Sequence, residues 1–319
     1  MMTGIRLSVL DLVPRIGEVS YETALQEAVV LASSAEQWGY SRYWAAEHHD
    51  LENLSCASPE LLLAHIGAKT DRIRLGTGAL LLPHYSPLKV AESFRLLAAL
   101  YPGRIDLGIG RAPGGSAHAS MALSGNFLQN VADMPKKMRA LIKLLEDRYV
   151  YDEQLVQARP FPQIQPDLWM LGTNSKSAGF AAEYGTGYVF GQFMSERDGA
   201  EVLKTYRESF HPSALLDKPR LMVAIGVICA ETEQEAEHLL RAAKLPGQPE
   251  RNGPGEQEVR GEPQNRLIYG TPEQVRKRLA LIADAYECDE FLVFTPVQDY
   301  QKRLDSYRML ASCCLGDHI

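Results

Sequence analysis

The sequence predicts an α/β protein folded as a (β/α)8 TIM barrel, and three observations lead to this fold class. Apolar runs rich in β-branched residues alternate with segments of helical period, which is typical of a parallel sheet covered by helices. Eight strand candidates, each followed by a helix candidate, fit within the 319 residues, a size that one barrel reaches. The first strand-to-helix turn holds only Gly17, so it lacks the glycine fingerprint of a doubly wound dinucleotide-binding sheet.

The chain is expected to form one domain over residues 1–319. The expected strands are apolar and short, and they are Ile5–Asp11, Ser41–Ala46, Ile73–Leu82, Ile105–Gly110, Leu168–Gly172, Tyr188–Gly191, Leu221–Cys229 and Glu290–Thr295. The expected helices have apolar residues three and four positions apart, and they are Tyr21–Trp38, Pro59–Lys69, Pro87–Tyr101, Val131–Arg148, Ser175–Tyr184, Glu196–Ser209, Thr232–Ala243, Pro272–Tyr286 and Tyr300–Leu315.

Two segments are longer than ordinary connections. Ala112–Asn130 follows the fourth strand, and Leu245–Arg266 precedes the seventh main helix. The second segment is rich in Gly, Pro, Gln and Glu and has almost no apolar residues, so we expect it to be mobile. Two interpretations of residues 245–266 remain open, a flexible lid over the barrel mouth and a disordered surface insertion.

Composition limits the kinds of partner. The net charge is -7 and the basic residues are scattered, which argues against a nucleic-acid groove or an anionic-membrane patch and favours a small molecule. No run approaches the ~20 apolar residues of a membrane-spanning helix, and the N-terminal segment lacks the apolar core of a secretory signal. The five cysteines show no CxxC spacing, so a reducing cytoplasm fits best.

The motif WAAEHHD places a carboxylate and two imidazoles at the end of the second strand, where active-site residues of a barrel lie. These residues are Glu47, His48 and His49. Neighbouring strand residues point to opposite faces, so two adjacent histidines seldom bind one ion, and no metal site is expected. General acid-base work by one imidazole is favoured over a purely structural polar residue. We expect His48 to act and His49 to turn towards Glu47 or the next loop as support.

Two further motifs at strand ends indicate an anion. GIGRAPGG places Arg111 among glycines after the fourth strand, although an exposed arginine in a turn is an alternative. LGTNSKSAGFAAEYG brings free backbone N–H groups and hydroxyls to the start of a helix, which favours a phosphate over an ordinary N-cap. Its residues of interest are Gly172, Thr173, Asn174 and Ser177.

Glycines near the end of the third strand predict a flat surface for a planar ring. Gly76 and Gly78 leave this surface without side chains, and Trp44, Tyr85 and Met194 are candidates to complete a pocket around it. A planar apolar slot, an imidazole and a phosphate-binding helix end together suit flavin mononucleotide (FMN).

Four motifs resemble the bacterial luciferase-like flavin-dependent monooxygenases in order and spacing: RYWAAEHH, IRLGTGALLLPHYSPLKVAE, LYPGRIDLGIGRAPGG and LGTNSKSAGFAAEYG. The resemblance covers nearly the whole chain. It implies a (β/α)8 barrel that binds reduced FMN from a separate flavin reductase, reacts with dioxygen through a flavin hydroperoxide and oxidises a small organic substrate. It also implies a homodimer.

The resemblance also implies roles for single residues. His48 matches the catalytic imidazole, with Glu47 and His49 beside it. Further positions match the cofactor site: Arg111, Asn174 and Ser177 at the FMN phosphate with Thr173 and Gly172 adjacent, and Gly78 and Ala79 at a cis peptide under the flavin ring.

Two departures and three alternatives limit this transfer. Gly110 stands where light-emitting members carry a reactive cysteine, and Thr173 where they carry a glutamate, so light emission is not inferred. The alternatives are a deazaflavin-dependent hydride-transfer oxidoreductase of the same barrel lineage, a non-catalytic flavin-binding protein and, remotely, a metal-dependent hydrolase.

Overall fold

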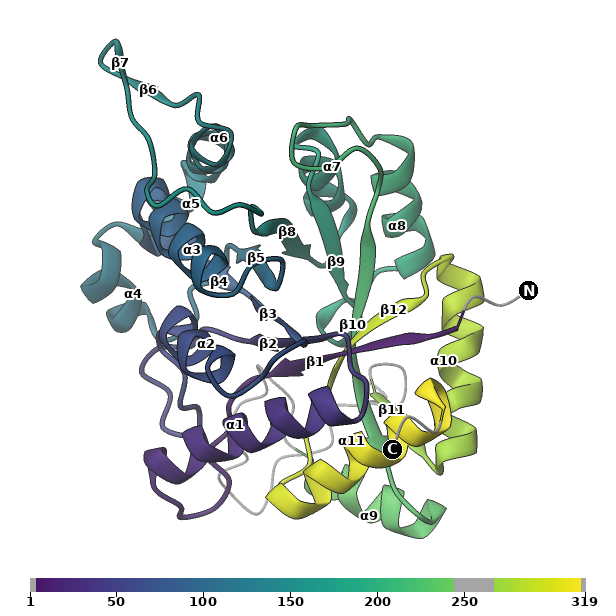
Figure 1. Ribbon diagram of the computed structural model, residues 1–319. Coiled ribbons are helices and arrows are strands. Elements are labelled where there is room, and N and C mark those ends of the chain that lie inside the picture. Colours follow the sequence, from purple (N-terminus) through teal and green to yellow (C-terminus); the bar gives the residue numbers. More distant parts are fainter. Residues whose placement is uncertain (1–3, 244–266, 317–319) are drawn as a thin grey trace.

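A computed structural model describes residues 4–243 and 267–316, and its centre is a closed barrel of eight parallel strands (Figure 1). The last of these strands pairs with both the first and the seventh, which closes the sheet on itself. The predicted TIM barrel is therefore confirmed. In order around the barrel, the strands are β1 (Arg6–Asp11), β2 (Arg42–Ala45), β3 (Arg74–Thr77), β5 (Ile105–Gly110), β8 (Asp167–Gly172), β9 (Gly187–Gly191), β10 (Leu221–Cys229) and β12 (Glu290–Phe294).

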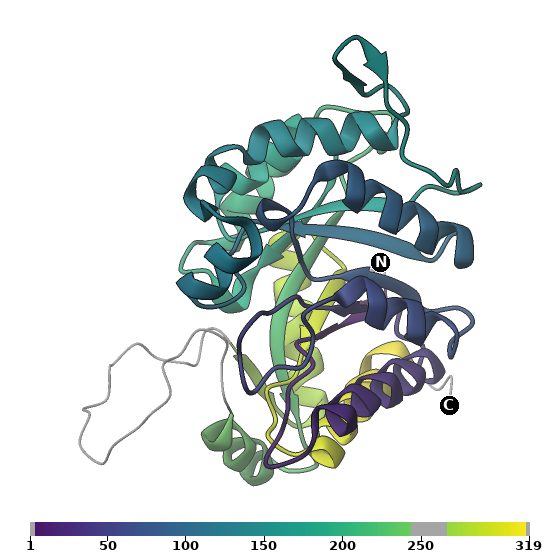
Figure 2. The same cartoon turned by 90° about the vertical axis from the view of Figure 1, so that its left-hand side faces the viewer.

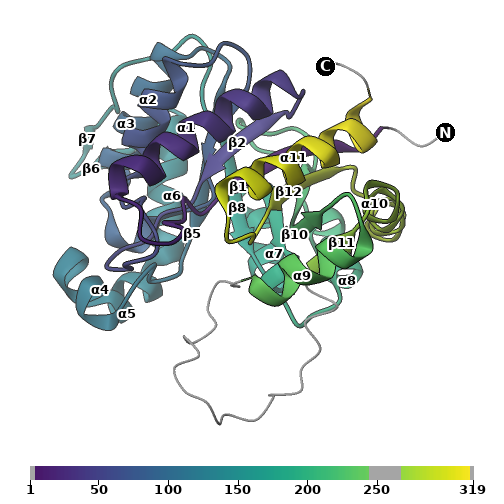
Figure 3. The ribbon, with the colours of Figure 1, turned by 90° about the horizontal axis from the view of Figure 1, so that it is seen from below.

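Helices cover the outside of the barrel. They are α1 (Tyr21–Gln37), α2 (Pro59–Gly67), α3 (Pro87–Leu100), α6 (Met134–Leu145), α7 (Ser175–Glu183), α8 (Gly199–Glu208), α9 (Glu233–Ala242), α10 (Pro272–Tyr286) and α11 (Tyr300–Leu315). The first and last helices, α1 and α11, pack side by side because β1 and β12 are neighbours (Figure 3). Within the described residues, no helix is long and apolar enough to cross a membrane.

The third predicted strand, Ile73–Leu82, is not continuous. It consists of β3 and a two-residue strand β4 (Leu80–Leu81), which pairs with β5, and the cis peptide Gly78–Ala79 lies between them. A side chain at position 78 would collide with the interior, since a Cβ on Gly78 would lie 2.5 Å from Leu10 Cδ1. The chain then turns through a short 3-10 helix, η1 (Leu82–His84), into α3.

Two helices and three strands were not predicted, and one predicted helix is divided. The long connection 112–130 contains α4 (Ala117–Ser124) and α5 (Phe127–Ala132), and the helix expected over 131–148 is instead the end of α5 followed by α6. Pro135 in the first turn of α6 explains the division, because proline lacks the N–H that a continuing helix needs.

Two short strand pairings complete the unexpected elements. The hairpin β6 (Val150–Tyr151) and β7 (Gln154–Leu155) is exposed and projects from the body in two perpendicular views (Figures 1 and 2). The strand β11 (Leu267–Gly270) pairs with the end of β10 outside the barrel. Two-residue strands are too short to show an apolar period. The predicted mobile loop 245–266 lies outside the described residues.

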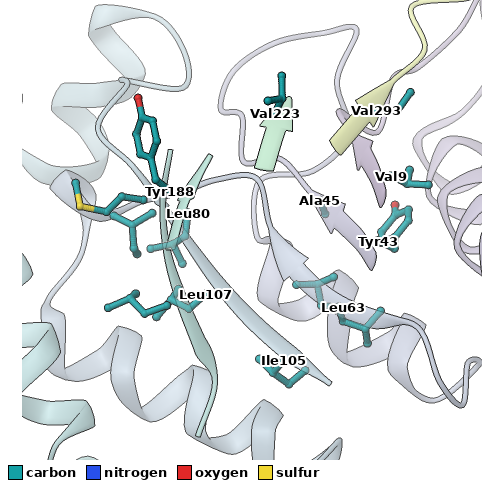
Figure 4. Close-up of a cluster of buried hydrophobic side chains, with 14 of the residues drawn as sticks. Val9, Tyr43, Ala45, Leu63, Leu80, Ile105, Leu107, Tyr188, Val223 and Val293 are labelled. Carbon is teal, nitrogen blue, oxygen red and sulfur yellow. The ribbon is translucent and has the colours of Figure 1, made fainter. Parts of the chain in front are cut away.

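The strands separate two apolar cores. The outer core packs strand residues such as Val9, Tyr43 and Leu107 against the helices (Figure 4). The inner core fills the barrel with Trp44, Trp169 and other large side chains, and the two tryptophan rings meet edge to face at 5.9 Å. Trp44 is fully buried in this inner core, so of the three candidates for the pocket it is a core residue. The filled interior leaves only the rim for chemistry.

Buried charges close the opposite end of the barrel, where the strands begin. Arg42 Nη1 lies 2.7 Å from Asp106 Oδ2, and its Nε lies 2.6 Å from Glu290 Oε1. Arg74 pairs with Asp106 and, at 2.8 Å, with Asp167. Burial raises the pKa of Asp106, but the charges of Arg42 and Arg74 outweigh it and hold that pKa below its usual value. This end of the barrel is a stabilising element.

Candidate active site at the barrel rim

The residues singled out in the sequence follow four strands that are neighbours in the barrel. Glu47, His48 and His49 follow β2, the Gly78–Ala79 peptide follows β3, Arg111 follows β5, and Thr173 follows β8. Because β2, β3, β5 and β8 are adjacent and parallel, these residues share one sector of the C-terminal rim.

Glu47 is a buried carboxylate that joins three separate segments of the chain. Its Oε1 accepts hydrogen bonds from His49 Nε2 at 2.7 Å and from Tyr85 Oη at 2.8 Å, and its Oε2 accepts from the Leu81 N–H at 2.9 Å. Its own N–H donates to Ala79 O at 3.3 Å. Glu47 thereby fixes the end of β2 against the cis peptide and β4.

Tyr85 also belongs to this arrangement. Its hydrogen bond to Glu47 could not be predicted from the sequence. Burial, reinforced by the Glu47 charge, raises the pKa of Tyr85, so its hydroxyl keeps its proton and donates to the carboxylate. The pairing depends on the turn after β4, which brings Tyr85 back to the end of β2.

The two adjacent imidazoles have different surroundings. His49 is bound to Glu47, as expected for a supporting role, and its N–H donates to Gly114 O at 2.8 Å. The His48 N–H donates to Cys56 O at 2.9 Å, whereas the buried His48 Nδ1 has no hydrogen-bond partner among the described residues. Burial lowers the pKa of His48 to about 4, with a smaller opposing effect from Glu47. His48 is therefore a neutral imidazole near pH 7.

The lowered pKa of His48 predicts a pH-dependent stability. Between pH 6.5, its ordinary pKa, and about 4, the unfolded chain binds more protons than the folded one, so stability falls as the pH is lowered through this window. The loss attributable to His48 reaches up to about 3 kcal/mol below the window. Urea unfolding at pH 7, 5 and 4 should show a shallower pH dependence in His48→Asn than in the parent. His238→Asn, which changes an exposed histidine on α9, should keep the parental dependence, and an equally steep dependence in His48→Asn would contradict the expectation.

Glycines of β5 make room for the bend that holds the cis peptide. A Cβ on Gly110 would lie 2.9 Å from Ala79 Cβ and 3.4 Å from Leu81 Cδ2, and a Cβ on Gly108 would collide with Thr77 O. The structure contains the cis peptide that the resemblance implies at Gly78–Ala79. Gly110 thus allows Ala79 to lie close to β5.

Gly110→Ala is expected to weaken FMN binding severalfold, because the added methyl group displaces Ala79 from the surface proposed to carry the flavin ring. The measurement is the dissociation constant for FMN by flavin fluorescence. Gly179→Ala in α7 is the matched control, since its added Cβ meets nothing within 4 Å, and it should retain the parental affinity. Equal affinities for both variants would contradict the role of Gly110.

The glycine pair after Arg111, Gly114 and Gly115, packs against His49. Gly114 has a φ of +71°, and a Cβ on Gly115 would collide with His49 O. The side chain of Arg111 is exposed at the rim.

At the start of α7, the side chains of Asn174 and Ser177 cap the helix. The Ser177 N–H donates to Asn174 Oδ1 at 3.1 Å, and the Asn174 N–H donates to Ser177 Oγ at 3.3 Å, which forms a capping box. Ser177 Oγ also lies 3.0 Å from Tyr188 Oη, and the absence of a side chain on Gly172 leaves space for it. The ordinary N-cap that the sequence left as an alternative is thus present.

The capping box leaves two donors for a ligand. The N–H groups of Ser175 and Lys176 lie in the first turn, where no carbonyl of the same helix can accept from them. Ile109 of β5 is the register partner of Met170 of β8. Arg111 and Gly172 each lie two residues beyond these partners, so Arg111 follows β5 beside this helix end. An anion here would bind backbone N–H groups and a guanidinium.

The remaining candidates are placed as follows. The Thr173 carbonyl accepts a hydrogen bond from Ser195 Oγ at 2.8 Å, which ties the end of β8 to the loop after β9. Met194 is half exposed in that loop. No group of three or more metal-ligating side chains gathers anywhere in residues 4–243 or 267–316.

Comparison with known proteins identifies the family. A family model described as luciferase-like monooxygenase matches residues 5–308. The uncharacterized protein YwcH of Bacillus subtilis (strain 168) is 42% identical over 96% of this chain and 98% of its own length. The N-acetyl-S-alkylcysteine monooxygenase of the same organism is 35% identical over 98% of this chain and 99% of its own. The crystal structure of apo-MsnO8 is similar with a TM-score of 0.86 and 34% identity, covering 97% of this chain and 98% of that one. The chain belongs to the family of luciferase-like monooxygenases.

Proposed function

We propose that this chain is a monooxygenase that uses reduced FMN, delivered by a separate flavin reductase, and dioxygen to oxidise a small organic substrate through a flavin hydroperoxide. The observation that carries the proposal is the arrangement of the rim: a neutral imidazole, His48, follows Glu47, whose N–H donates to the carbonyl of the Gly78–Ala79 cis peptide. Family membership and a relative that is named a monooxygenase support the same reaction class.

The residues present fit FMN. The small residues Gly78 and Ala79 at the end of β3 suit a planar ring, and the Ser175 and Lys176 N–H groups with Arg111 suit a phosphate two strands away. Reduced FMN would supply the electrons that activate dioxygen. His48 would accept or hold a proton close to the reacting atoms, and Glu47 would keep His49 and the Ala79 segment in place.

The phosphate assignment is tested by binding alone. FMN should bind more tightly than riboflavin, which lacks the phosphate, by about tenfold or more. Arg111→Ala should reduce the ratio of the affinities for FMN and riboflavin. Arg72→Ala, which removes an exposed arginine just before β3, should leave this ratio unchanged. Equal binding of FMN and riboflavin would overturn the phosphate site.

The reaction class is tested by stopped-flow absorbance. When reduced FMN bound to the protein is mixed with aerated buffer, we expect a transient whose spectrum differs from reduced and oxidised flavin. Immediate reoxidation with no transient would contradict the proposal. Tighter binding of an 8-hydroxy-5-deazaflavin than of FMN would favour hydride transfer without dioxygen instead. The homodimer implied by the resemblance stays a prediction, which sedimentation velocity can check.

A further inference from the structure

A cavity of about 490 Å³ opens between the loop after β1 and the loop after β2. His48 forms part of its wall, together with the apolar side chains of Tyr21, Leu51 and Leu54. Its volume is in the range that holds a small organic molecule. The function proposed above uses His48 but assigns nothing to this cavity.

His48 and Glu47 link the wall of the cavity to the surface proposed for the flavin ring. His48 lines the cavity, and the next residue towards β2, Glu47, donates its N–H to Ala79 O of the cis peptide at 3.3 Å. A molecule in the cavity would therefore contact His48, whose neighbour in the chain is bonded to the cis peptide. This is the position that a substrate needs if His48 handles its proton.

Negative charge predominates at the cavity. Asp50 and Glu52 both line it. Among the described residues in contact with this wall, Arg15 supplies positive charge: its Nη2 lies 3.5 Å from Glu52 Oε1, and its guanidinium lies 4.9 Å from the centroid of the Tyr21 ring. The Asp50 carboxylate accepts a hydrogen bond from the neutral Ser116 hydroxyl at 3.1 Å. One negative charge is thus left uncompensated.

Two residues of this wall also carry a buried polar atom. His48 Nδ1 and Ser55 Oγ have no hydrogen-bond partner among the described residues, and both residues line the cavity. Buried polar groups left unpaired are costly, so a bound molecule that hydrogen-bonds to them gains affinity. The apolar wall, the unpaired polar atoms and the net negative charge of the cavity together indicate which ligand fits.

We propose that this cavity binds the substrate and that the substrate is a small organic cation, an apolar body carrying a protonated amine, with carboxylates disfavoured. That the bound molecule is the substrate rests on the proposed function, but the charge preference of the cavity does not. The apolar body would lie against Leu51, Leu54 and the Tyr21 ring, and the ammonium group would face Asp50 and Glu52.

Binding of three ligands of one size and different charge tests the preference. Benzylamine, benzyl alcohol and benzoate are titrated into the full chain without flavin, followed by ligand-observed and His48-ring NMR. We expect affinity to fall in that order, and the difference to shrink at high salt. Benzoate binding as tightly as benzylamine, or binding that leaves the His48 signals unmoved, would overturn the inference.

Variants separate charge from shape. Asp50→Asn and Glu52→Gln should each lower the preference for benzylamine over benzyl alcohol about threefold, the size of an exposed ion pair. Ala57→Phe should instead weaken all three ligands alike, because Ala57 lines the cavity and the ring fills it. Glu201→Gln, which changes an exposed glutamate on α8, is the control and should leave the affinities for all three ligands unchanged. An unchanged preference in Asp50→Asn and Glu52→Gln would overturn the inference.

The two proposals fail in different ways. A preference for benzylamine without any absorbance transient in the oxygen experiment would overturn the proposed monooxygenase reaction and leave the cavity's charge preference standing. A transient without a charge preference would overturn only the inference about the substrate.

Discussion

His48→Ala is expected to lower the turnover number about a hundredfold or more, the usual contribution of a positioned acid-base group. The physical reason is that His48 is neutral near pH 7 and its Nδ1 is held by no described residue, so its ring is free to hydrogen-bond to the reacting groups. The measurement is steady-state oxidation of an aryl sulfide or amine with an excess of flavin reductase. The dissociation constant for FMN should change little, because the proposed phosphate contacts follow other strands.

His118→Ala is the control for this experiment. His118 is an exposed residue of α4, and its loss should leave turnover unchanged. An unaltered turnover number in His48→Ala, with unaltered decay of the flavin transient, would show that His48 has no catalytic role. A loss confined to FMN affinity would make His48 a binding residue instead.

Glu47→Ala is expected to lower the free energy of unfolding by about 3 kcal/mol, because it leaves the His49 ring, the Tyr85 hydroxyl and the Leu81 N–H without their buried acceptor. The same change should weaken FMN binding, since the Leu81 N–H, two residues after Ala79, loses its hydrogen bond to the Glu47 carboxylate. Urea unfolding measures the first effect and flavin fluorescence the second.

Graded variants check this account of Glu47. Glu47→Gln retains one acceptor oxygen and should lose less stability than Glu47→Ala, and Tyr85→Phe removes one hydrogen bond and should cost about 1 kcal/mol. If Glu47→Ala unfolds at the same urea concentration as the parent, the three hydrogen bonds do not stabilise the rim.

The barrel was predictable because its strands and helices have long apolar patterns of clear period. The expected strand Leu221–Cys229 agrees with β10 at both ends, and the expected helix Pro272–Tyr286 agrees with α10. The interruption of the third strand was visible only through the resemblance, since Gly78 and Ala79 read as part of an apolar run. The β6 and β7 strands were not predictable, because two exposed residues each show no period.

The site was predictable in position and less so in detail. The barrel rule placed Glu47, His48 and His49 at the rim, because strand ends converge there. The bonds from Glu47 to Tyr85 and Leu81 depend on a turn that no local pattern reports. The sequence did not decide between barrel interior and pocket for Trp44, because that choice depends on the register of β2, which fully buries its ring.

The buried ion pairs of Arg42 and Arg74 with Asp106, Glu290 and Asp167 have a practical consequence for protein engineering. They anchor the ends of the strands most distant from the rim loops, so sequence diversity introduced at residues 50–57 leaves this anchor intact. Directed evolution of substrate scope can therefore randomise residues 50–57, because the intact anchor lets the protein tolerate many destabilising changes in that loop. A library that preserves the anchor should yield more folded clones than one that randomises as many buried positions at the strand starts.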